Sequence, residues 1–123
     1  MTKALVVDGD PLNMELELEM LNAAGFTAEG AQDGAEVIKK IDTEIYDLIL
    51  TEIRLYGMDG IELRKIIKSK PVYERVPVIA LTAYAMKGDK ERFLSAGFDD
   101  YISKPIDVHD FMKRVGRYKN VPE

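Results

Sequence analysis

Five short runs rich in Val, Ile and Leu recur along the chain, and a longer segment of mixed apolar and polar residues follows each of them. The runs begin near residues 4, 26, 47, 76 and 99 and read ALVVD, FTAEGA, DLILTEI, VPVIALT and DDYIS. Three of them are almost continuously apolar, which is typical of parallel strands covered by helices on both faces. The pattern predicts five strand-plus-helix units. The second, less apolar strand is expected nearer an edge of the sheet.

The segments between the runs contain helix signals. The first, PLNMELELEMLNAAG, alternates apolar residues as a half-buried strand would, but Pro11 follows a capping Asp10 and the composition favours a helix. We therefore predict a helix there, with Gly25 as its C-terminal cap. Asp33 and Asp59 are expected to cap the second and third helices. Helices are expected near 33–44, 59–69, 87–96 and 107–118, the last with an apolar stripe of Val108, Phe111, Met112 and Val115.

Strands that alternate with helices through short loops predict an open, doubly wound α/β sheet with helices on both faces. The chain has 123 residues, too few for a closed eight-fold barrel and typical of one domain. It contains no repeat, low-complexity stretch or Pro/Gly/Ser-rich linker, so we expect a single domain over residues 1–123.

Composition excludes several classes of protein. The absence of cysteine excludes disulfides, thiol catalysis and cysteine metal sites, and fits a reducing compartment, so a cytoplasmic location is expected. The N-terminus lacks the apolar stretch of a signal peptide, and no later run approaches the roughly 18 apolar residues of a membrane span. The net charge of -5 disfavours binding to nucleic acid. We therefore expect neither membrane nor nucleic acid as a partner.

Polar residues gather where the predicted strands end. Ligands of doubly wound sheets bind at the carboxyl ends of the strands, where the loops converge. Carboxylates beside one ammonium and one hydroxyl suit a divalent cation and a phosphoryl group. Each residue also has an ordinary structural role, such as helix cap or surface charge, and only their joint placement favours a site. The set consists of Asp8, Asp10, Glu52, Thr82 and Lys104, with Pro105 after the lysine.

In the segments LVVDGDPLNM, DLILTEIRLYGMDGIEL and VPVIALTAYAMKGDKERFLSAGFDDYISKP, the chain resembles the receiver domains of bacterial and archaeal two-component response regulators. The closing amphipathic helix matches as well, so the resemblance covers essentially the whole chain. It implies a flavodoxin-like fold, with a five-stranded parallel sheet of order 2-1-3-4-5 and five helices.

The resemblance also implies roles for individual residues. A histidine kinase would donate a phosphoryl group at the position of Glu52, Thr82 would contact the phosphoryl oxygens and Lys104 would neutralise them. Tyr101 matches the aromatic switch residue of the fifth strand. Mg²⁺ would be bound by an acidic pair after the first strand, by the acceptor and by a backbone carbonyl. The corresponding ligands here are Asp8, Glu52 and the carbonyl of Arg54, with Asp10 as a substitute for a missing acid.

Three positions depart from the family pattern: Glu52 replaces the acceptor Asp, Gly9 replaces the second acid of the pair, and Tyr56 replaces a proline. An extra methylene that moves the carboxylate by about 1 Å is expected to slow phosphoryl transfer about 100-fold or more. Loss of an acid weakens Mg²⁺ binding. We expect Glu52 to imitate the phosphorylated state in part, because a carboxylate has one negative charge and a phosphoryl group about 1.5 to 2.

The leading hypothesis is a stand-alone pseudo-receiver without an output domain, which is not an enzyme and acts by protein–protein contact. Its partner would be a sensor histidine kinase or a downstream signalling protein, and the chain itself a monomer or weak homodimer. The contact face, formed by the fourth helix, fifth strand and fifth helix, would present Lys87, Lys90, Arg92, Asp107, His109 and Lys113 around Tyr101.

Two alternatives remain open. The first is a Mg²⁺-dependent receiver that accepts a phosphoryl group on Glu52 or a neighbouring acid. The second, more distant, is a flavodoxin-like cofactor-binding module. Such a module needs a loop rich in glycine and hydroxyl groups after the first strand, and DGDPLN has one glycine and no serine or threonine.

Overall fold

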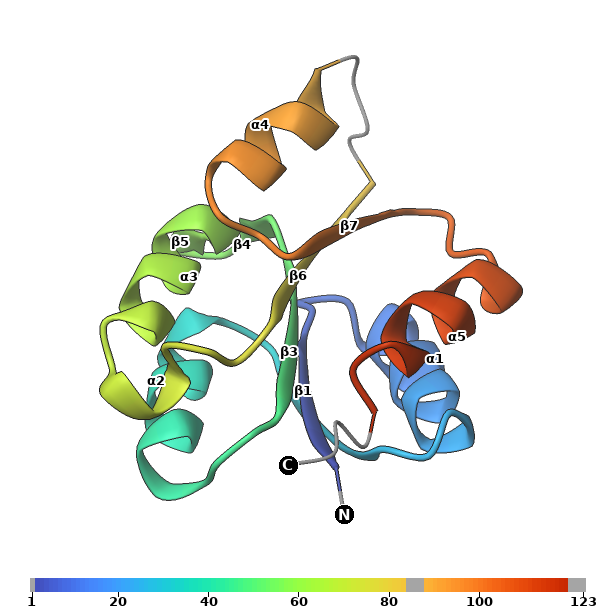
Figure 1. The fold of residues 1–123 in the computed structure, drawn as a ribbon, viewed down its shortest axis with the longest axis horizontal. Helices are drawn as coiled ribbons and strands as arrows, with labels where there is room; N and C mark the ends of the chain where they lie inside the picture. The colour runs from blue at the N-terminus through green and yellow to red at the C-terminus, as the bar shows by residue number, and fades with distance from the viewer. Residues whose placement is uncertain (1, 84–87, 120–123) are drawn as a thin grey trace.

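A central parallel sheet of five strands, in the order β2-β1-β3-β6-β7, organises the computed structural model, which describes residues 2–83 and 88–119 (Figure 1). When the five strands of this sheet are counted along the chain, the order is the predicted 2-1-3-4-5, with β2 at an edge as expected. The strands are β1 (Lys3–Val7), β2 (Thr27–Ala31), β3 (Leu48–Glu52), β6 (Val78–Thr82) and β7 (Asp100–Ser103).

Helices cover both faces of the sheet. Figure 1 shows α1 and α5 on one side and α2 and α3 on the other. The helices are α1 (Pro11–Ala23), α2 (Gly34–Thr43), α3 (Gly60–Lys68), α4 (Asp89–Ser95) and α5 (Val108–Gly116). An aspartate side chain accepts a backbone N–H at the start of four of them, and these caps are Asp10, Asp33, Asp59 and Asp107. Over the described ranges, every helix is too short or too polar to span a bilayer.

The predicted helices are observed, with small differences in their bounds. The fourth begins at Asp89, and residue 87, where we expected its start, lies outside the described residues. Gly25 follows α1 with a φ of 98°, which fits its expected place at the end of that helix. Two short elements were not predicted: a hairpin of β4 (Arg54–Leu55) and β5 (Met58–Asp59), and a 3-10 turn at Pro71–Tyr73.

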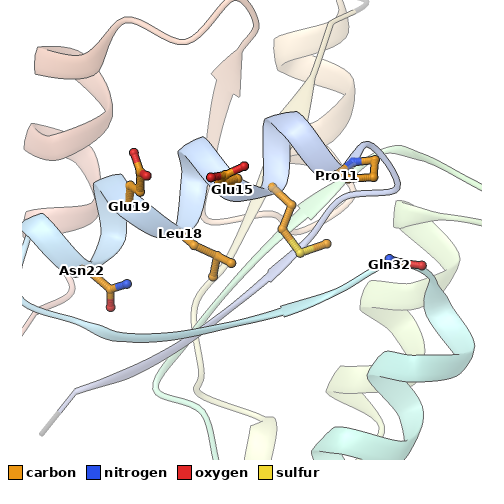
Figure 2. A pocket seen from close by; sticks show the side chains of 7 residues that line it. Pro11, Glu15, Leu18, Glu19, Asn22 and Gln32 are labelled. Atoms are coloured by element: carbon orange, nitrogen blue, oxygen red, sulfur yellow. The ribbon is translucent and has the colours of Figure 1, made fainter.

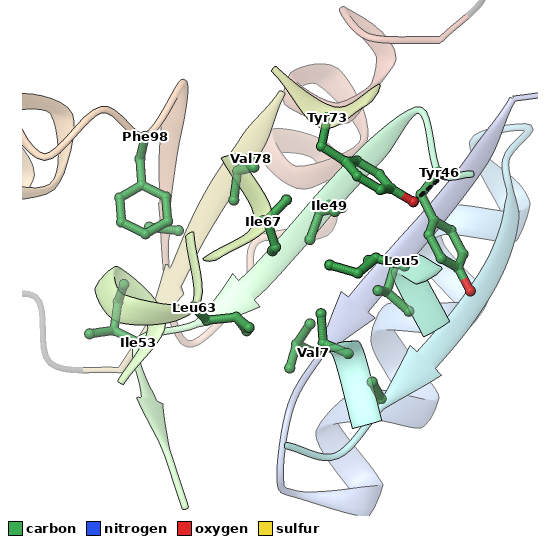
Figure 3. Close-up of a cluster of buried hydrophobic side chains, with 14 of the residues drawn as sticks. Leu5, Val7, Tyr46, Ile49, Ile53, Leu63, Ile67, Tyr73, Val78 and Phe98 are labelled. Atoms are coloured by element: carbon green, nitrogen blue, oxygen red, sulfur yellow. Dashed lines mark hydrogen bonds between the residues drawn. The ribbon is translucent and has the colours of Figure 1, made fainter. Parts of the chain in front are cut away.

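Two apolar layers stabilise the sheet, one on each face. The layer beneath α2 and α3 includes Leu5, Ile49, Leu63 and Ile67, all fully buried (Figure 3). Tyr73 closes one end of this layer, where its hydroxyl donates to the carbonyl of Glu44 at 2.6 Å and accepts the backbone N–H of Tyr46 at 3.3 Å. The opposite layer packs α1 and α5 against the sheet through Leu21, Leu50, Phe111 and Val115.

Helix α1 buries an unexpected face. Glu17 is 0% exposed, whereas Leu12 is 77% and Leu16 is 45% exposed. A comparable difference occurs in α5, where Val108 of the predicted apolar stripe lies in the first turn and is 51% exposed. The helix predictions are therefore confirmed, but the apolar pattern alone did not identify every side chain that faces the core.

Gly60 lies where α3 approaches the end of β3. Its N–H donates to the carbonyl of Ile53 at 2.7 Å, and a Cβ at this position would lie 2.6 Å from the carbonyl oxygen of Glu52. Since backbone cannot move aside cheaply, we expect Gly60→Ala to lower the free energy of unfolding by about 1 to 3 kcal/mol in urea denaturation.

Gly116→Ala is the matched control for this substitution. Gly116 also belongs to a helix, but no atom lies within 4 Å of a Cβ built there. The control is expected to be neutral or stabilising by up to about 1 kcal/mol, because alanine favours helix more than glycine does. Equal losses from both alanines would contradict the close approach of α3 to β3.

Candidate functional site

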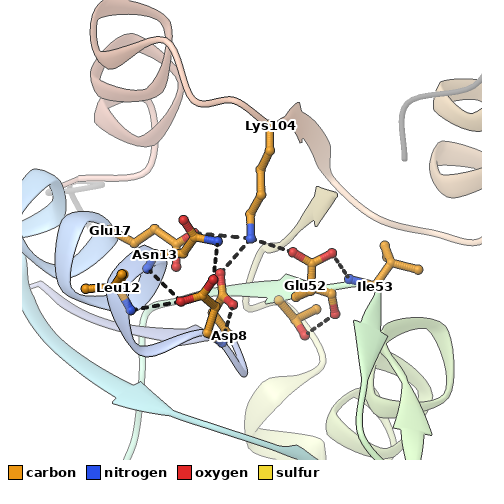
Figure 4. A network of polar contacts seen from close by, with 9 residues as sticks. Asp8, Leu12, Asn13, Glu17, Glu52, Ile53 and Lys104 are labelled. Atoms are coloured by element: carbon orange, nitrogen blue, oxygen red, sulfur yellow. Dashed lines mark hydrogen bonds and ion pairs between the residues drawn. The ribbon is translucent and has the colours of Figure 1, made fainter. Parts of the chain in front are cut away.

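Three charged side chains meet at the carboxyl ends of β1, β3 and β7 (Figure 4). Asp8 follows β1, Glu52 is the last residue of β3 and Lys104 follows β7. The Nζ atom of Lys104 lies 2.6 Å from Oδ2 of Asp8 and 2.6 Å from Oε2 of Glu52. The expected meeting of these three side chains is therefore observed, and one ammonium bridges two carboxylates.

The backbone orients both carboxylates toward the lysine. Oδ1 of Asp8 accepts the N–H of Asp10 at 2.9 Å, and Oε1 of Glu52 accepts the N–H of Ile53 at 3.2 Å. Each carboxylate thus has one oxygen on a backbone amide and the other on the ammonium. Burial by itself would lower the pKa of Lys104, but the hydrogen bonds with Asp8 and Glu52 outweigh it and raise that pKa above its usual range. The lysine is therefore charged at neutral pH.

Glu17, from α1, completes the cluster from the helix side. It is fully buried, and its Oε2 lies 3.7 Å from Nζ of Lys104. Neither of its carboxylate oxygens has a hydrogen-bond partner among the described residues. Burial, and next the negative charge of Asp8, raise the pKa of Glu17 to about 9, so this acid is protonated at neutral pH.

Glu17 was not among the predicted site residues. The signal that could have identified it is its spacing, three and four residues before the buried Met20 and Leu21, which puts it on the inward face of α1. We define Asp8, Glu17, Glu52 and Lys104 as the acid–lysine cluster.

Asp10 lies outside the acid–lysine cluster, in the capping role that Pro11 indicated. Its Oδ1 accepts the N–H of Leu12 at 2.9 Å and that of Asn13 at 3.4 Å. Its Oδ2 accepts from the side-chain amide of Asn13 at 3.3 Å. Both carboxylate oxygens of Asp10 therefore bind the start of α1.

Thr82 and Arg54 border the cluster. Thr82 is buried at the end of β6, and its carbonyl accepts the N–H of Lys104 at 2.8 Å, so it adjoins the site through the backbone. Arg54, in β4, lines a shallow pocket of about 360 Å³ together with Asp8, Glu52 and Lys104. A cis peptide bond joins Lys104 to Pro105.

Tyr101 lies in β7 and is partly buried. Its ring stacks on that of Phe93 in α4, with ring centroids 5.7 Å apart and an interplanar angle of 24°. Burial raises the pKa of its hydroxyl. The stacking ties β7 to α4, two of the three elements of the expected contact face.

The arrangement does not fit Mg²⁺, which requires about six oxygen ligands at about 2.0 to 2.1 Å in octahedral geometry. Asp8 and Glu52 each direct an oxygen at the ammonium of Lys104, position 9 has no side chain, and Asp10 caps α1. Across residues 2–83 and 88–119, no three Asp, Glu or His side chains are placed to bind one metal ion. The predicted ligand residues Asp8, Asp10, Glu52 and Arg54 line one pocket, but the carboxylates of the three acids are directed at Lys104 or at the start of α1 and not at a common point.

The fold and the cluster together define a class of protein. The strand order reverses at β1 and β3, and the crevice outside the ends of these strands is where doubly wound sheets bind their ligands. Asp8 and Glu52 lie at that point, beside a partly buried lysine. The molecule is thus a doubly wound α/β domain with a polar site at the switch point of its sheet.

Comparisons with known proteins identify the family within this class. The sequence model of the response regulator receiver domain matches residues 4–116. The polar-differentiation response regulator DivK of Brucella ovis is 38% identical over 119 residues, which cover 96% of this chain and 97% of that protein. The chain belongs to the response regulator receiver domain family.

Solved structures agree with this assignment. The chemotaxis response regulator CheY4 of Vibrio cholerae superimposes with a TM-score of 0.88 at 25% identity, over 96% of this chain and 98% of that chain. The receiver domain of the sensor histidine kinase PA1611 from Pseudomonas aeruginosa, described with a magnesium ion coordinated in its active-site cleft, has a TM-score of 0.85 at 32% identity. That match covers 95% of this chain and 96% of the other.

Proposed function

We propose that this chain is a pseudo-receiver in two-component signalling, which acts by protein–protein contact and does not depend on phosphoryl transfer. The observation that supports this is the double contact of Lys104, whose ammonium lies 2.6 Å from both Glu52 and Asp8. In the family pattern, this lysine neutralises a phosphoryl group on the acceptor. Here the carboxylate of Glu52 already forms an ion pair with the ammonium of Lys104.

In this proposal, Glu52 imitates the phosphorylated acceptor in part. It brings one negative charge to Lys104, where a phosphoryl group would bring about 1.5 to 2. A shift from 1:99 to 99:1 in a two-state equilibrium requires about 5.5 kcal/mol, more than one ion pair usually contributes. We therefore propose a bias toward the active shape and not a locked state. The chain is then not an enzyme in its own right.

The experiment restores two of the three family residues that this chain lacks, the two aspartates. Gly9→Asp and Glu52→Asp are combined in one variant, and this variant and the parent are incubated with acetyl phosphate and Mg²⁺ before intact-mass measurement. Position 9 has room for the change, because a Cβ there would meet only the carbonyl oxygen of Gln32 at 3.6 Å, an ordinary contact. We expect the mass of one phosphoryl group on the double variant and none on the parent.

A second variant, Gly9→Asp with Glu52→Asn, is the control, because it restores the metal-ligand position and removes the acceptor carboxylate. It should remain unlabelled, since an amide cannot form the acyl phosphate. Equal labelling of the parent and the Gly9→Asp, Glu52→Asp variant would contradict the pseudo-receiver proposal.

The second candidate function is phosphoryl acceptance on Glu52 itself. The observation that favours it is the presence of Thr82 and Lys104 at the ends of β6 and β7, because hydroxyl and ammonium groups suit phosphoryl oxygens. The same mass measurement distinguishes the two candidates. A labelled parent whose label disappears in Glu52→Gln would support this second function.

The proposed partner is a sensor histidine kinase or a downstream signalling protein. The contact face lies on α4, β7 and α5 around Tyr101. Its described members are all exposed: Lys90, Arg92, Asp107, His109 and Lys113. Lys87, also expected there, lies outside the described residues. The guanidinium of Arg92 lies over the ring of Phe93, 4.8 Å from its centroid, beside the stacked Tyr101.

A further inference from the structure

Acidic residues are concentrated in the first third of the chain. Residues 4–38 contain eight Asp and Glu and no Lys or Arg, so all 17 basic residues lie elsewhere, with the 14 other acids. This stretch forms most of β1, all of α1 and β2, and the start of α2. These elements are neighbours at one end of the sheet and form an acidic side of the molecule. Of its eight acids, Asp8 and Glu17 are buried beside Lys104, and Glu29 pairs with Lys3 and Lys40.

An apolar groove lies within this acidic side, between α1 and β2. It has a volume of about 330 Å³, and we define it as the α1–β2 groove by the residues that line it: Pro11, Met14, Glu15, Leu18, Glu19, Asn22 and Gln32. Figure 2 shows Leu18 pointing from α1 toward β2, and Glu15 and Glu19 along the same helix. The groove thus combines an apolar floor with carboxylates on its helical wall.

The two carboxylates of the α1–β2 groove are available to a partner. Glu15 and Glu19 are both exposed, and no residue in the described part of the chain forms an ion pair or a side-chain hydrogen bond with either. This contrasts with Glu29 in β2, which pairs with Lys3 and Lys40.

The shape of the α1–β2 groove indicates the size of its occupant. The lining residues from Pro11 to Asn22 recur on successive turns of α1, and twelve helical residues span about 18 Å. Opposite α1, the groove is lined by Gln32, which directly follows β2, an edge strand with β1 on one side only. A groove this long, open beside a strand edge, is suited to a segment of polypeptide.

We propose that the α1–β2 groove binds an amphipathic protein segment whose apolar side chains are flanked by Lys or Arg. The apolar side chains would pack on Met14 and Leu18, and the cations would pair with Glu15 and Glu19. Membrane surfaces and nucleic acids are anionic and would be repelled by this side. The groove does not involve α4, β7 or α5, so this inference is independent of the proposed function.

The test uses a synthetic peptide of about 14 residues made of Leu and Lys, with the leucines three and four residues apart so that they share one helical face. It is titrated into the full chain, labelled with ¹⁵N, and backbone amide shifts are followed. We expect the largest shifts at Met14, Leu18, Asn22 and Gln32. A peptide with Glu in place of every Lys is expected to bind at least about tenfold more weakly.

Matched variants separate a specific groove from general attraction between opposite charges. Glu15→Lys with Glu19→Lys is expected to weaken binding of the Lys peptide at least about tenfold. Glu62→Lys with Glu91→Lys changes the net charge equally at exposed positions on α3 and α4, and should weaken binding less than about twofold. Thermal unfolding of all variants checks that each remains folded.

Three results would overturn the proposal. The first is equal weakening by the two pairs of substitutions, which would indicate attraction by net charge alone. The second is a set of shifts centred away from α1 and β2. The third is self-association of the parent in sedimentation that Glu15→Lys with Glu19→Lys abolishes, because the occupant would then be a second copy of this chain.

Discussion

Glu17→Gln is expected to remove a large part of the pH dependence of stability and to make the protein more stable than the parent above neutral pH. The pKa of Glu17 is raised to about 9 in the folded chain, from an ordinary value of 4.5. A raised pKa contributes stability that is fully present below pH 4.5 and is lost as the pH rises toward 9. Over that range the folded state retains a proton on Glu17 that the unfolded state releases. The free energy of unfolding therefore falls by about 1.4 kcal/mol for each pH unit.

Urea denaturation at pH 5 and pH 8 measures this effect. Glu17 is fully buried, so between pH 5 and pH 8 the parent should lose about 4 kcal/mol more unfolding free energy than Glu17→Gln does. The glutamine variant should therefore be the more stable protein at pH 8. Glu19→Gln is the control, since Glu19 is exposed on the same helix and should leave the pH dependence unchanged. Parallel pH profiles for the parent and Glu17→Gln would show that Glu17 is ionised in the folded chain.

The fold could be predicted from the sequence because its signals are local and repeated. Apolar runs such as DLILTEI become strands with no exposed residue, and an aspartate marks the start of most helices. The hairpin of β4 and β5 was not predicted, because strands of two residues leave no periodic pattern. The face that α1 buries was not predicted either, since Met14, Leu16 and Leu18 alternate in a manner that does not distinguish inside from outside.

The sequence predicts those site residues that lie at the ends of strands. Asp8, Glu52 and Lys104 meet because the carboxyl ends of parallel strands share one edge of the sheet. Glu17 comes from a helix and reaches the same point from the side, so a search of strand ends does not find it. From the sequence, the carboxylate of Asp10 could serve either as a metal ligand or as the cap of α1. Its contacts with the backbone at the start of α1 show the capping role, and this is a matter of geometry that the sequence does not contain.

Glu17 and Lys104 together explain how three acids share one buried location. Lys104 neutralises one carboxylate charge directly, and the proton on Glu17 removes another, so the cluster has a net charge close to -1 at neutral pH. A buried charge is costly unless it is paired, and the free energy of the cluster therefore depends on the one ammonium that contacts all three acids.

Lys104→Met is expected to be the most destabilising substitution considered, with a loss of about 3 to 5 kcal/mol in the free energy of unfolding at neutral pH. The side chains of Lys104, Asp8 and Glu52 are only 12%, 4% and 10% exposed, so water would compensate the loss of the ammonium only in part. Methionine retains the volume and flexibility of the lysine stem and removes the charge together with its hydrogen-bond donors. Since small domains have about 5 to 15 kcal/mol of stability in total, the variant should unfold at a clearly lower urea concentration.

The pH dependence of this loss identifies its cause. If uncompensated carboxylates cause the destabilisation, acidic pH should reduce it, because protonation removes the charges that Lys104 had neutralised. Urea denaturation of parent and variant at pH 7 and pH 4 is the measurement, and Lys39→Met is the control, since Lys39 is exposed on α2 and should cost less than about 0.5 kcal/mol at both pH values. A loss of the same size at pH 4 would mean that the hydrogen bonds donated by the ammonium, and not its compensation of the carboxylate charges, hold the strand ends together. Recovery at pH 4 would show that the ammonium offsets the repulsion between Asp8 and Glu52, the physical condition on which the imitation of a phosphorylated acceptor depends.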